Sequence, residues 1–183
     1  MRITENRLQT YEILHATKVA SLAGECTVLL KKDGRFPLSA PGPIALYGAG
    51  VRHTIRGGGG SGEVNIRRFE TVEQAMERAG FSVSSKDWLD GYDAARAAAG
   101  EAFYQQLKAA ADAMGVPVVF AAIGQTVPEP VYELPLDGEA DTALYILARN
   151  SSEGGDRKDV PGDYTLTETE IRLSSNTSPR ATV

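Results

Sequence analysis

The sequence predicts an α/β fold, a three-layer α/β/α sandwich with a mostly parallel sheet. Two apolar runs, PIALYGAG (43–50) and TALYILAR (142–149), have the length of strands. Neither run alternates with polar residues, which is typical of strands buried on both faces of a parallel sheet. Segments with helical periodicity separate the two runs, and strands that alternate with helices predict helix layers on both faces of the sheet.

The N-terminal part predicts one helix and one strand before the first buried run. Apolar residues at helical spacing, among them Tyr11 and Val19, predict an amphipathic helix over about residues 5–23, and Gly24 should end it. TVLLKK (27–32) has the β-branched and leucine content of a strand.

The middle of the chain predicts two helices. In TVEQAMERAGF (71–81), Thr71 is placed to cap a helix, Gln74 occupies the reciprocal capping-box position and Gly80 should end it. An alanine-rich helical region follows over residues 86–114, and two glycines are expected to weaken or break it. These glycines are Gly91 and Gly100.

The C-terminal part predicts a strand, a connector and a final helix. VPVVFAAIG (116–124) resembles a strand, whereas TVPEPVYELPLDG (126–138) is too rich in proline for a central strand. After the second buried run, LTETEI (166–171) begins a helix that Thr165 or Thr167 could cap. We expect one domain over residues 1–173, incomplete because this helix should lead to a further strand, and a disordered polar tail over residues 174–183.

Composition excludes several classes of function. The 183 residues carry a net charge of −5 with no basic stripe, so a nucleic-acid partner is not expected. The only cysteine, Cys26, cannot form an internal disulfide. Two histidines, His15 and His53, lack the spacing of a metal site, so no metal or cofactor is expected. Without an apolar leader or a run of membrane length, the chain is predicted to be cytoplasmic and to have no membrane partner.

The glycine-rich segment GAGVRHTIRGGGGSGE (48–63) leaves nucleotide binding open as a disfavoured alternative to a flexible turn. His53 stands where the dinucleotide fingerprint needs its third glycine. Glu63 stands where a phosphate loop needs lysine, and its charge would repel phosphate. The glycines could instead let a ligand approach the backbone, with the Ser61 hydroxyl beside it.

Glu153 is the acid whose position invites a catalytic interpretation. It follows a buried strand, which is where open α/β sheets place their ligand sites. Asp156 and Arg157 could pair and hold its loop. On residue types alone the more common interpretation is a solvated loop acid, because surface loops are rich in exposed carboxylates.

Four stretches of the sequence resemble glycoside hydrolase family 3, the β-glucosidase family, in its α/β-sandwich (C-terminal) domain. They occur in the family's order and are ECTVLLKKDGRFPL (25–38), IALYGAG (44–50), TIRGGGGSGEVN (54–65) and ALYILARNSSEGGDRKDVPGDYTLTETE (143–170). The last is similar to the family pattern AIxVISRxSGEGxDRxxxxGDYxLxxxE. Gly59 and Ser152 depart from the family, which often has threonine and usually has glycine at these positions.

The resemblance implies a role for the residues that match its motifs. Glu153 matches the acid/base glutamate, and Asp156 and Arg157 then support its loop. Ser61, with Gly60 and Gly62, matches the loop that contacts the sugar. Retaining glycosidases need a second carboxyl group about 5–5.5 Å away. In this family that nucleophilic aspartate belongs to a (β/α)8 barrel, which this chain lacks.

The resemblance therefore implies a truncated part of a retaining β-glucosidase that is inactive alone. Its expected partners are a β-linked glucoside or oligosaccharide and the missing barrel, with homo-oligomers possible through faces left uncovered. The alternatives are a non-catalytic carbohydrate-binding or interaction domain and the nucleotide-binding module considered above.

Overall fold

The computed structural model describes the greater part of the chain, and its contacts form two compact units. The described residues are 7–32, 37–58, 62, 66, 69–150 and 157–176, without the side chains of residues 174 and 176. Unit 1 comprises residues 1–40 and 65–69, and unit 2 comprises residues 41–64 and 70–183.

Unit 1 contains one helix and no strand among its described residues. Helix α1 runs over Thr10–Leu22 and begins with a reciprocal capping box between Gln9 and Glu12, so it is shorter at both ends than predicted. The strand predicted for residues 27–32 is wrong, since these residues are exposed, form no regular secondary structure and lie outside the sheet. A strand needs a hydrogen-bonded neighbour to be stable, and its own residue types cannot supply one.

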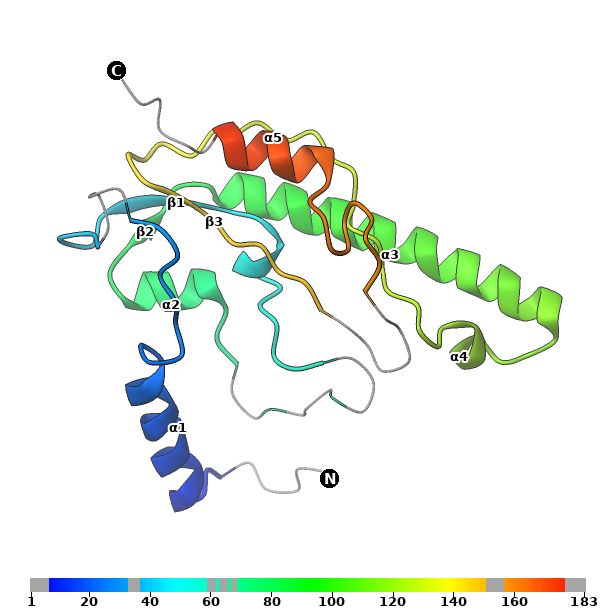
Figure 1. Cartoon of the computed structure of the whole chain (residues 1–183), viewed down its shortest axis with the longest axis horizontal. Helices are drawn as coiled ribbons and strands as arrows, with labels where there is room; N and C mark the ends of the chain where they lie inside the picture. The colour runs from blue at the N-terminus through cyan, green and yellow to red at the C-terminus, as the bar shows by residue number, and fades with distance from the viewer. Residues whose placement is uncertain are drawn as a thin grey trace. The chain divides into compact units, whose positions relative to one another are not determined.

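The sheet of unit 2 is parallel and confirms the predicted α/β fold (Figure 1). Its strands are β1 (Pro43–Tyr47), β2 (Ser82–Val83) and β3 (Ala143–Tyr145), in the order β2-β1-β3. Ile44 pairs with Val83 on one edge of β1, and Leu46 pairs with Leu144 on the other. The central strand is buried from Ile44 to Tyr47, as the first apolar run predicted.

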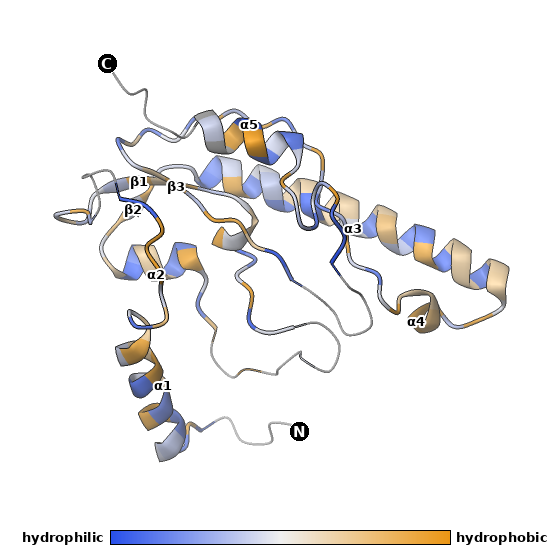
Figure 2. Cartoon of the chain, viewed as in Figure 1, coloured by the Kyte–Doolittle hydropathy of each residue, from blue (hydrophilic) through white to orange (hydrophobic). Residues whose placement is uncertain are grey.

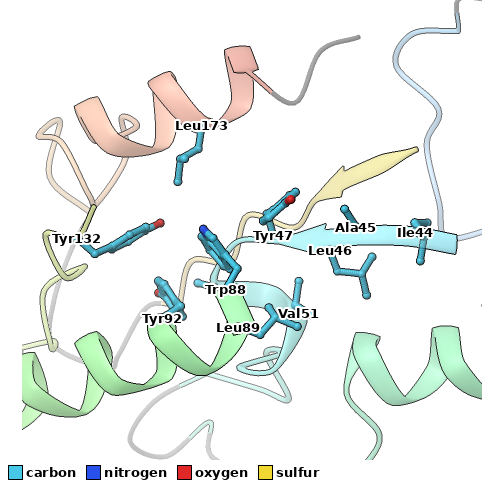
Figure 3. Close-up of a cluster of buried hydrophobic side chains, with 11 residues drawn as sticks. Ile44, Ala45, Leu46, Tyr47, Val51, Trp88, Leu89, Tyr92, Tyr132 and Leu173 are labelled. Atoms are coloured by element: carbon cyan, nitrogen blue, oxygen red, sulfur yellow. The ribbon is translucent and has the colours of Figure 1, made fainter. Parts of the chain in front are cut away.

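Helices lie on both sides of this sheet. The helical elements of unit 2 are η1 (Ala49–Val51), α2 (Val72–Arg78), α3 (Lys86–Met114), α4 (Val118–Ala121) and α5 (Glu168–Asn176). Helices α2 and α5 lie on opposite sides of β1 in Figures 1 and 3. Figure 2 shows that α5 is hydrophilic in its first turn and hydrophobic in its middle. Its buried Leu173 belongs to the core.

Local capping signals predicted where α2 and α5 begin. Thr71 and Gln74 form the expected capping box of α2. Thr167, one of two candidates, caps α5 by accepting a hydrogen bond from the Glu170 N–H at 3.1 Å. The domain boundary expected at residue 173 falls inside α5, which continues to Asn176. Residues 177–183 of the expected tail lie outside the described residues.

The strand predicted for residues 116–124 is wrong, and the two glycines of α3 do not break that helix. Residues 116–124 form the single turn of α4 and not a strand, because the left-handed Gly115 ends α3 and Pro117 starts a new turn. Helix α3 runs unbroken through Gly91 and Gly100. Gly91 lies so close to Leu134 that an added Cβ would come within 2.9 Å of its Cδ2, whereas Gly100 faces open space.

An aromatic cluster joins the N-terminal end of α3 to the sheet and to α5 (Figure 3). The Trp88 ring stacks on Tyr92 with centroids 5.5 Å apart. It also meets Tyr47 of β1 and Tyr132 edge to face, at 5.2 and 5.8 Å. These geometries are favourable for aromatic pairs and fix α3 against the carboxyl end of β1.

Ser85 completes the hydrogen bonding of the central strand where β2 ends. Its hydroxyl accepts a hydrogen bond from the Leu46 N–H at 2.8 Å and donates one to the Leu46 carbonyl at 2.7 Å. The side chain is 1% exposed. Although Ser85 precedes α3, its hydroxyl makes no bond to that helix, because it serves the sheet instead.

We expect Ser85→Ala to destabilise unit 2 by about 2–4 kcal/mol, because it leaves two buried backbone groups of Leu46 without partners. Urea unfolding monitored by Trp88 fluorescence measures this change. The matched control is Ser84→Ala, which should cost less than about 1 kcal/mol, because the Ile44 carbonyl keeps the Ser84 N–H at 2.9 Å. Equal effects of the two substitutions would contradict this role of Ser85.

The two glycines of α3 should respond differently to alanine. Gly100→Ala should stabilise the protein by about 1 kcal/mol through helix propensity, which corresponds to a rise in Tm of about 2–4 °C. Gly91→Ala should stabilise the protein less than Gly100→Ala, or destabilise it, because the new methyl group would crowd Leu134. Thermal unfolding of the two variants tests the difference, and an equal rise in both would be inconsistent with the close packing at Gly91.

Candidate functional site

A cleft of about 560 Å³ lies at the carboxyl ends of β1 and β3. This is the edge at which parallel α/β sheets place their ligand sites. Arg96 of α3 and Thr167 at the start of α5 complete its wall. The remaining lining residues are Ala49, His53, Ile55, 124–129, 148–150, 157, 158 and 160–163.

The glycines after β1 let the exits of β1 and β3 lie side by side. Gly48 has a φ of +94°, and a Cβ there would come within 2.6 Å of the Ile146 carbonyl oxygen. A Cβ on Gly50 would lie equally close to the Ile146 side chain, and the Gly50 N–H donates to the Ile146 carbonyl at 2.9 Å. Only glycine fits both positions. The GAG part of the glycine-rich segment is therefore explained by packing between the two strand exits.

Arg149 is the first charged residue after β3, and its guanidinium is bonded on three sides. Nη2 donates to Glu170 Oε2 at 2.6 Å, Nε donates to the Asp163 carbonyl at 3.0 Å, and Nη1 donates to the Ala148 carbonyl at 3.2 Å. Glu170 is 1% exposed. Burial raises the pKa of Glu170, but the hydrogen bonds from Arg149 and Thr167 outweigh burial and hold it below the ordinary glutamate value.

The turn at residues 160–165 binds Arg157, the charged side chain that follows the candidate catalytic segment (residues 151–156). Arg157 pairs with the Asp163 carboxylate, and the Lys158 N–H donates to Asp163 Oδ2 at 2.7 Å. The hydrogen bond from Arg157 lowers the pKa of Asp163, and the Lys158 N–H adds to the effect. Gly162, with a φ of +86°, closes the turn by donating its N–H to the Thr165 carbonyl.

Glu129 is a half-buried carboxyl group in the cleft that the sequence analysis missed. It accepts a hydrogen bond from the Tyr92 hydroxyl at 2.7 Å. Burial raises its pKa, although the Tyr92 hydrogen bond acts in the opposite direction. Its only signal in the sequence is its position between two prolines, Pro128 and Pro130, in a segment predicted only to be a connector.

His53 is held at the rim of the cleft by a charged network. Its Nε2 lies 2.7 Å from Asp93 Oδ1. The adjacent Arg52 contacts the same aspartate at 2.9 Å and also pairs with Glu73 and Asp90. The hydrogen bond with Glu73 is the largest cause that raises the pKa of Arg52. This network ties the chain after η1 to α2 and α3.

Most of the residues predicted for the site lie outside the described residues. These are Glu153, Asp156, Ser61 and Gly60. Gly62 is described and exposed, with open space around it. Arg157 lines the cleft and pairs with Asp163, whereas its predicted partner Asp156 is not described.

The described residues show neither a metal site nor a membrane span. Within these parts of the chain, no three His, Cys, Asp or Glu side chains gather in a way that could hold a metal ion. Across the same residues, no helix has both the length and the apolar character needed to cross a bilayer.

The fold and the cleft define an α/β domain whose candidate site lies at the carboxyl edge of a parallel sheet. No protein-family model matches the sequence. The chain is 30% identical over 151 residues to β-glucosidase A of Butyrivibrio fibrisolvens, and the alignment covers 79% of this chain and 16% of that protein. It is 31% identical over 110 residues to thermostable β-glucosidase B of Acetivibrio thermocellus, covering 60% of this chain and 15% of that protein.

Solved structures agree with these sequence relatives. β-Glucosidase 3B of Thermotoga neapolitana in complex with α-D-glucose matches with a TM-score of 0.62 and 24% identity, covering 92% of this chain and 22% of that one. A second structure of the same enzyme with glucose matches with a TM-score of 0.58 and 26% identity, over 91% and 22% of the two chains. The chain is thus homologous to one segment of the β-glucosidases, and the resemblance to glycoside hydrolase family 3 is confirmed.

The pKa of Glu129 leads to a prediction about stability and pH. Because its pKa is raised in the folded protein, ionisation of Glu129 lowers stability as the pH rises through that value. Glu129→Gln keeps an oxygen for Tyr92 but cannot ionise. We expect the stability of this variant relative to the parent to increase between about pH 4 and about pH 7. Urea unfolding across this range measures it.

Glu133→Gln is the matched control for this prediction, because Glu133 is an exposed carboxyl group four residues further along the same segment. The Glu133→Gln variant should not show the increase in relative stability that we expect of Glu129→Gln. If Glu129→Gln and Glu133→Gln followed the same course, burial of Glu129 would not explain the pH dependence.

Proposed function

We propose that this chain is the part of a retaining β-glucosidase that supplies the acid/base glutamate, Glu153, and a loop that contacts the sugar through Ser61, Gly60 and Gly62. One observation carries the proposal: the described flanks of both segments border a single cleft. His53 and Ile55 line it ahead of residues 59–65, and Asn150 and Arg157 line it on either side of residues 151–156.

The proposed chemistry divides the two carboxyl groups between two parts of one enzyme. Glu153 donates a proton to the leaving glycosidic oxygen and later takes a proton from the attacking water. The nucleophile is an aspartate of a (β/α)8 barrel that is not part of this chain. Substrate and the nucleophile carboxylate would raise the pKa of Glu153 into the range that a general acid needs, by burial and by repulsion of like charge.

The relatives and the cleft both support a class of substrate. The curated relatives are β-glucosidases, so we propose a β-linked glucoside or oligosaccharide as the substrate. A cleft of about 560 Å³ has the size of small-molecule sites in general. In this proposal Arg157 and Asp156 support the segment of Glu153, and the Arg157–Asp163 pair is the described part of that support.

We expect the 183-residue chain alone to show no turnover of an aryl β-glucoside, because it supplies one of the two carboxyl groups that a double displacement needs. Release of the chromogenic phenol, followed at high protein concentration, measures this. Turnover with burst kinetics and retention of configuration would contradict the division of the carboxyl groups between two domains.

A chimaera tests Glu153 directly. The segment of Butyrivibrio fibrisolvens β-glucosidase A that matches this chain is replaced by this chain, and an active chimaera then receives Glu153→Ala. We expect kcat to fall by about 10²–10⁴-fold for a substrate whose leaving group needs protonation. Azide should restore part of the activity on activated aryl glucosides, because it attacks the glycosyl-enzyme without a general base.

The matched control in the chimaera is Asp159→Ala, which removes an exposed acid from the same region of the chain. It should leave kcat within about twofold of the parent chimaera. An active chimaera that tolerates Glu153→Ala as well as Asp159→Ala would remove Glu153 from the acid/base role.

A further inference from the structure

We propose that Glu170 is a positioning residue for the segment that carries Glu153. Through Arg149, Glu170 holds the residues just before this segment (148–150, the upstream flank) to the turn at residues 160–165. The same turn also binds Arg157, with which the downstream flank begins. The inference rests on the proposed function for the catalytic role of Glu153. The anchoring itself rests only on described residues, which are Arg149, Arg157, Asp163 and Glu170.

The upstream flank is tied down by Arg149. Its guanidinium reaches Glu170 Oε2 at 2.6 Å and the Asp163 carbonyl at 3.0 Å. The arginine side chain is 16% exposed and the glutamate side chain 1%. An ion pair removed from water in this way is costly to break, because a displaced partner would leave a buried charge uncompensated.

The downstream flank, which begins at Arg157, also contacts Asp163. Arg157 pairs with the Asp163 carboxylate, and the Lys158 N–H donates to Oδ2 of that carboxylate at 2.7 Å. The Asp163 carbonyl therefore accepts hydrogen bonds from both arginines, from Arg157 at 3.3 Å, and the Asp163 carboxylate pairs with Arg157 alone. Arg149 and Arg157, which stand on either side of residues 151–156 in the sequence, therefore contact one turn.

The charge of Glu170 is not needed for its second role, which is to cap α5. Its Oε2 accepts from the Thr167 N–H at 2.8 Å while its own N–H donates to the Thr167 hydroxyl. Helix α2 closes the same capping box with an amide, Gln74. An amide is therefore sufficient for the cap, and the buried negative charge at residue 170 is accounted for by Arg149.

The carboxylate of Glu170 is matched to Arg149 and not to the cap. Glu170 Oε1 is buried without a hydrogen-bond partner among the described residues, so Oε2 makes the contacts with both Arg149 and Thr167. Because an amide would cap α5 without burying a charge, the acid at residue 170 is accounted for by the guanidinium that it compensates.

Glu170→Gln in the 183-residue chain separates the two roles, because glutamine keeps the capping box and loses the charge. Hydrogen exchange should become at least about tenfold faster for the described amides at 148–150 and 157–165. Exchange in β1 and the N-terminal half of α3 should rise by a smaller factor than exchange in the two flanks. Exchange that is unchanged in the two flanks, or raised equally in β1 and α3, would overturn the proposal.

Two further variants bracket this result. Asp112→Asn breaks the exposed Lys108–Asp112 pair at the far end of α3 and should leave exchange in both flanks unchanged. Glu170→Ala removes cap and charge together. Should it unfold unit 2, Glu170→Gln still decides the question, because its cap is intact.

Kinetics in the active chimaera test whether the anchor positions the catalytic group. Glu170→Gln should lower kcat by about 10–100-fold with KM changed by less than about twofold, because binding groups elsewhere stay in place. Unchanged kcat together with loosened flanks would overturn the positioning role but leave the proposed function intact. A chimaera insensitive to Glu153→Ala would overturn the proposed function itself, and the exchange data would still report on the anchor.

Discussion

The backbone of β1 is the element on which the rest of unit 2 depends. Its two edges are satisfied by partners from four parts of the chain: β2, the Ser85 hydroxyl, β3 and the residues next to β3. Since β2 pairs over only two residues, a side chain has to continue its edge. Each partner also begins or ends an element that borders the cleft or the core. The hydrogen bonds that the backbone of β1 requires therefore bring α3, β3 and the turn at Gly48 and Gly50 together.

Two carboxyl groups near the cleft show how partners, more than burial, decide charge. Burial acts on Glu129 and on Glu170 in the same direction. Glu129 has a neutral phenol as its hydrogen-bond partner and its pKa stays raised, whereas the guanidinium of Arg149 reverses the effect of burial at Glu170. One wall of the domain thus holds a carboxyl group that resists ionisation and another that favours it.

Signals that act within a few residues could be predicted from the sequence, and signals that join distant segments could not. The capping box at Thr71, the cap at Thr167 (one of two candidates) and the buried run of β1 are local, and all three are confirmed. The apolar stretches at 27–32 and 116–124 look like strands, but pairing is a property of neighbours that composition does not encode. The Arg149–Glu170 pair spans 21 positions. Both residues lie in the motif that resembles the β-glucosidases, but only the fold shows that they touch.

The turn at Asp163 binds the two arginines through overlapping sets of atoms. Arg149 binds only the main-chain carbonyl, which every amino acid retains, whereas Arg157 binds the carboxylate and, at 3.3 Å, the same carbonyl. A substitution at residue 163 therefore removes the ion pair with Arg157 and leaves the carbonyl contacts of both arginines in place. Side-chain scanning, in the laboratory or by natural variation, would detect the ion pair but not the carbonyl contacts.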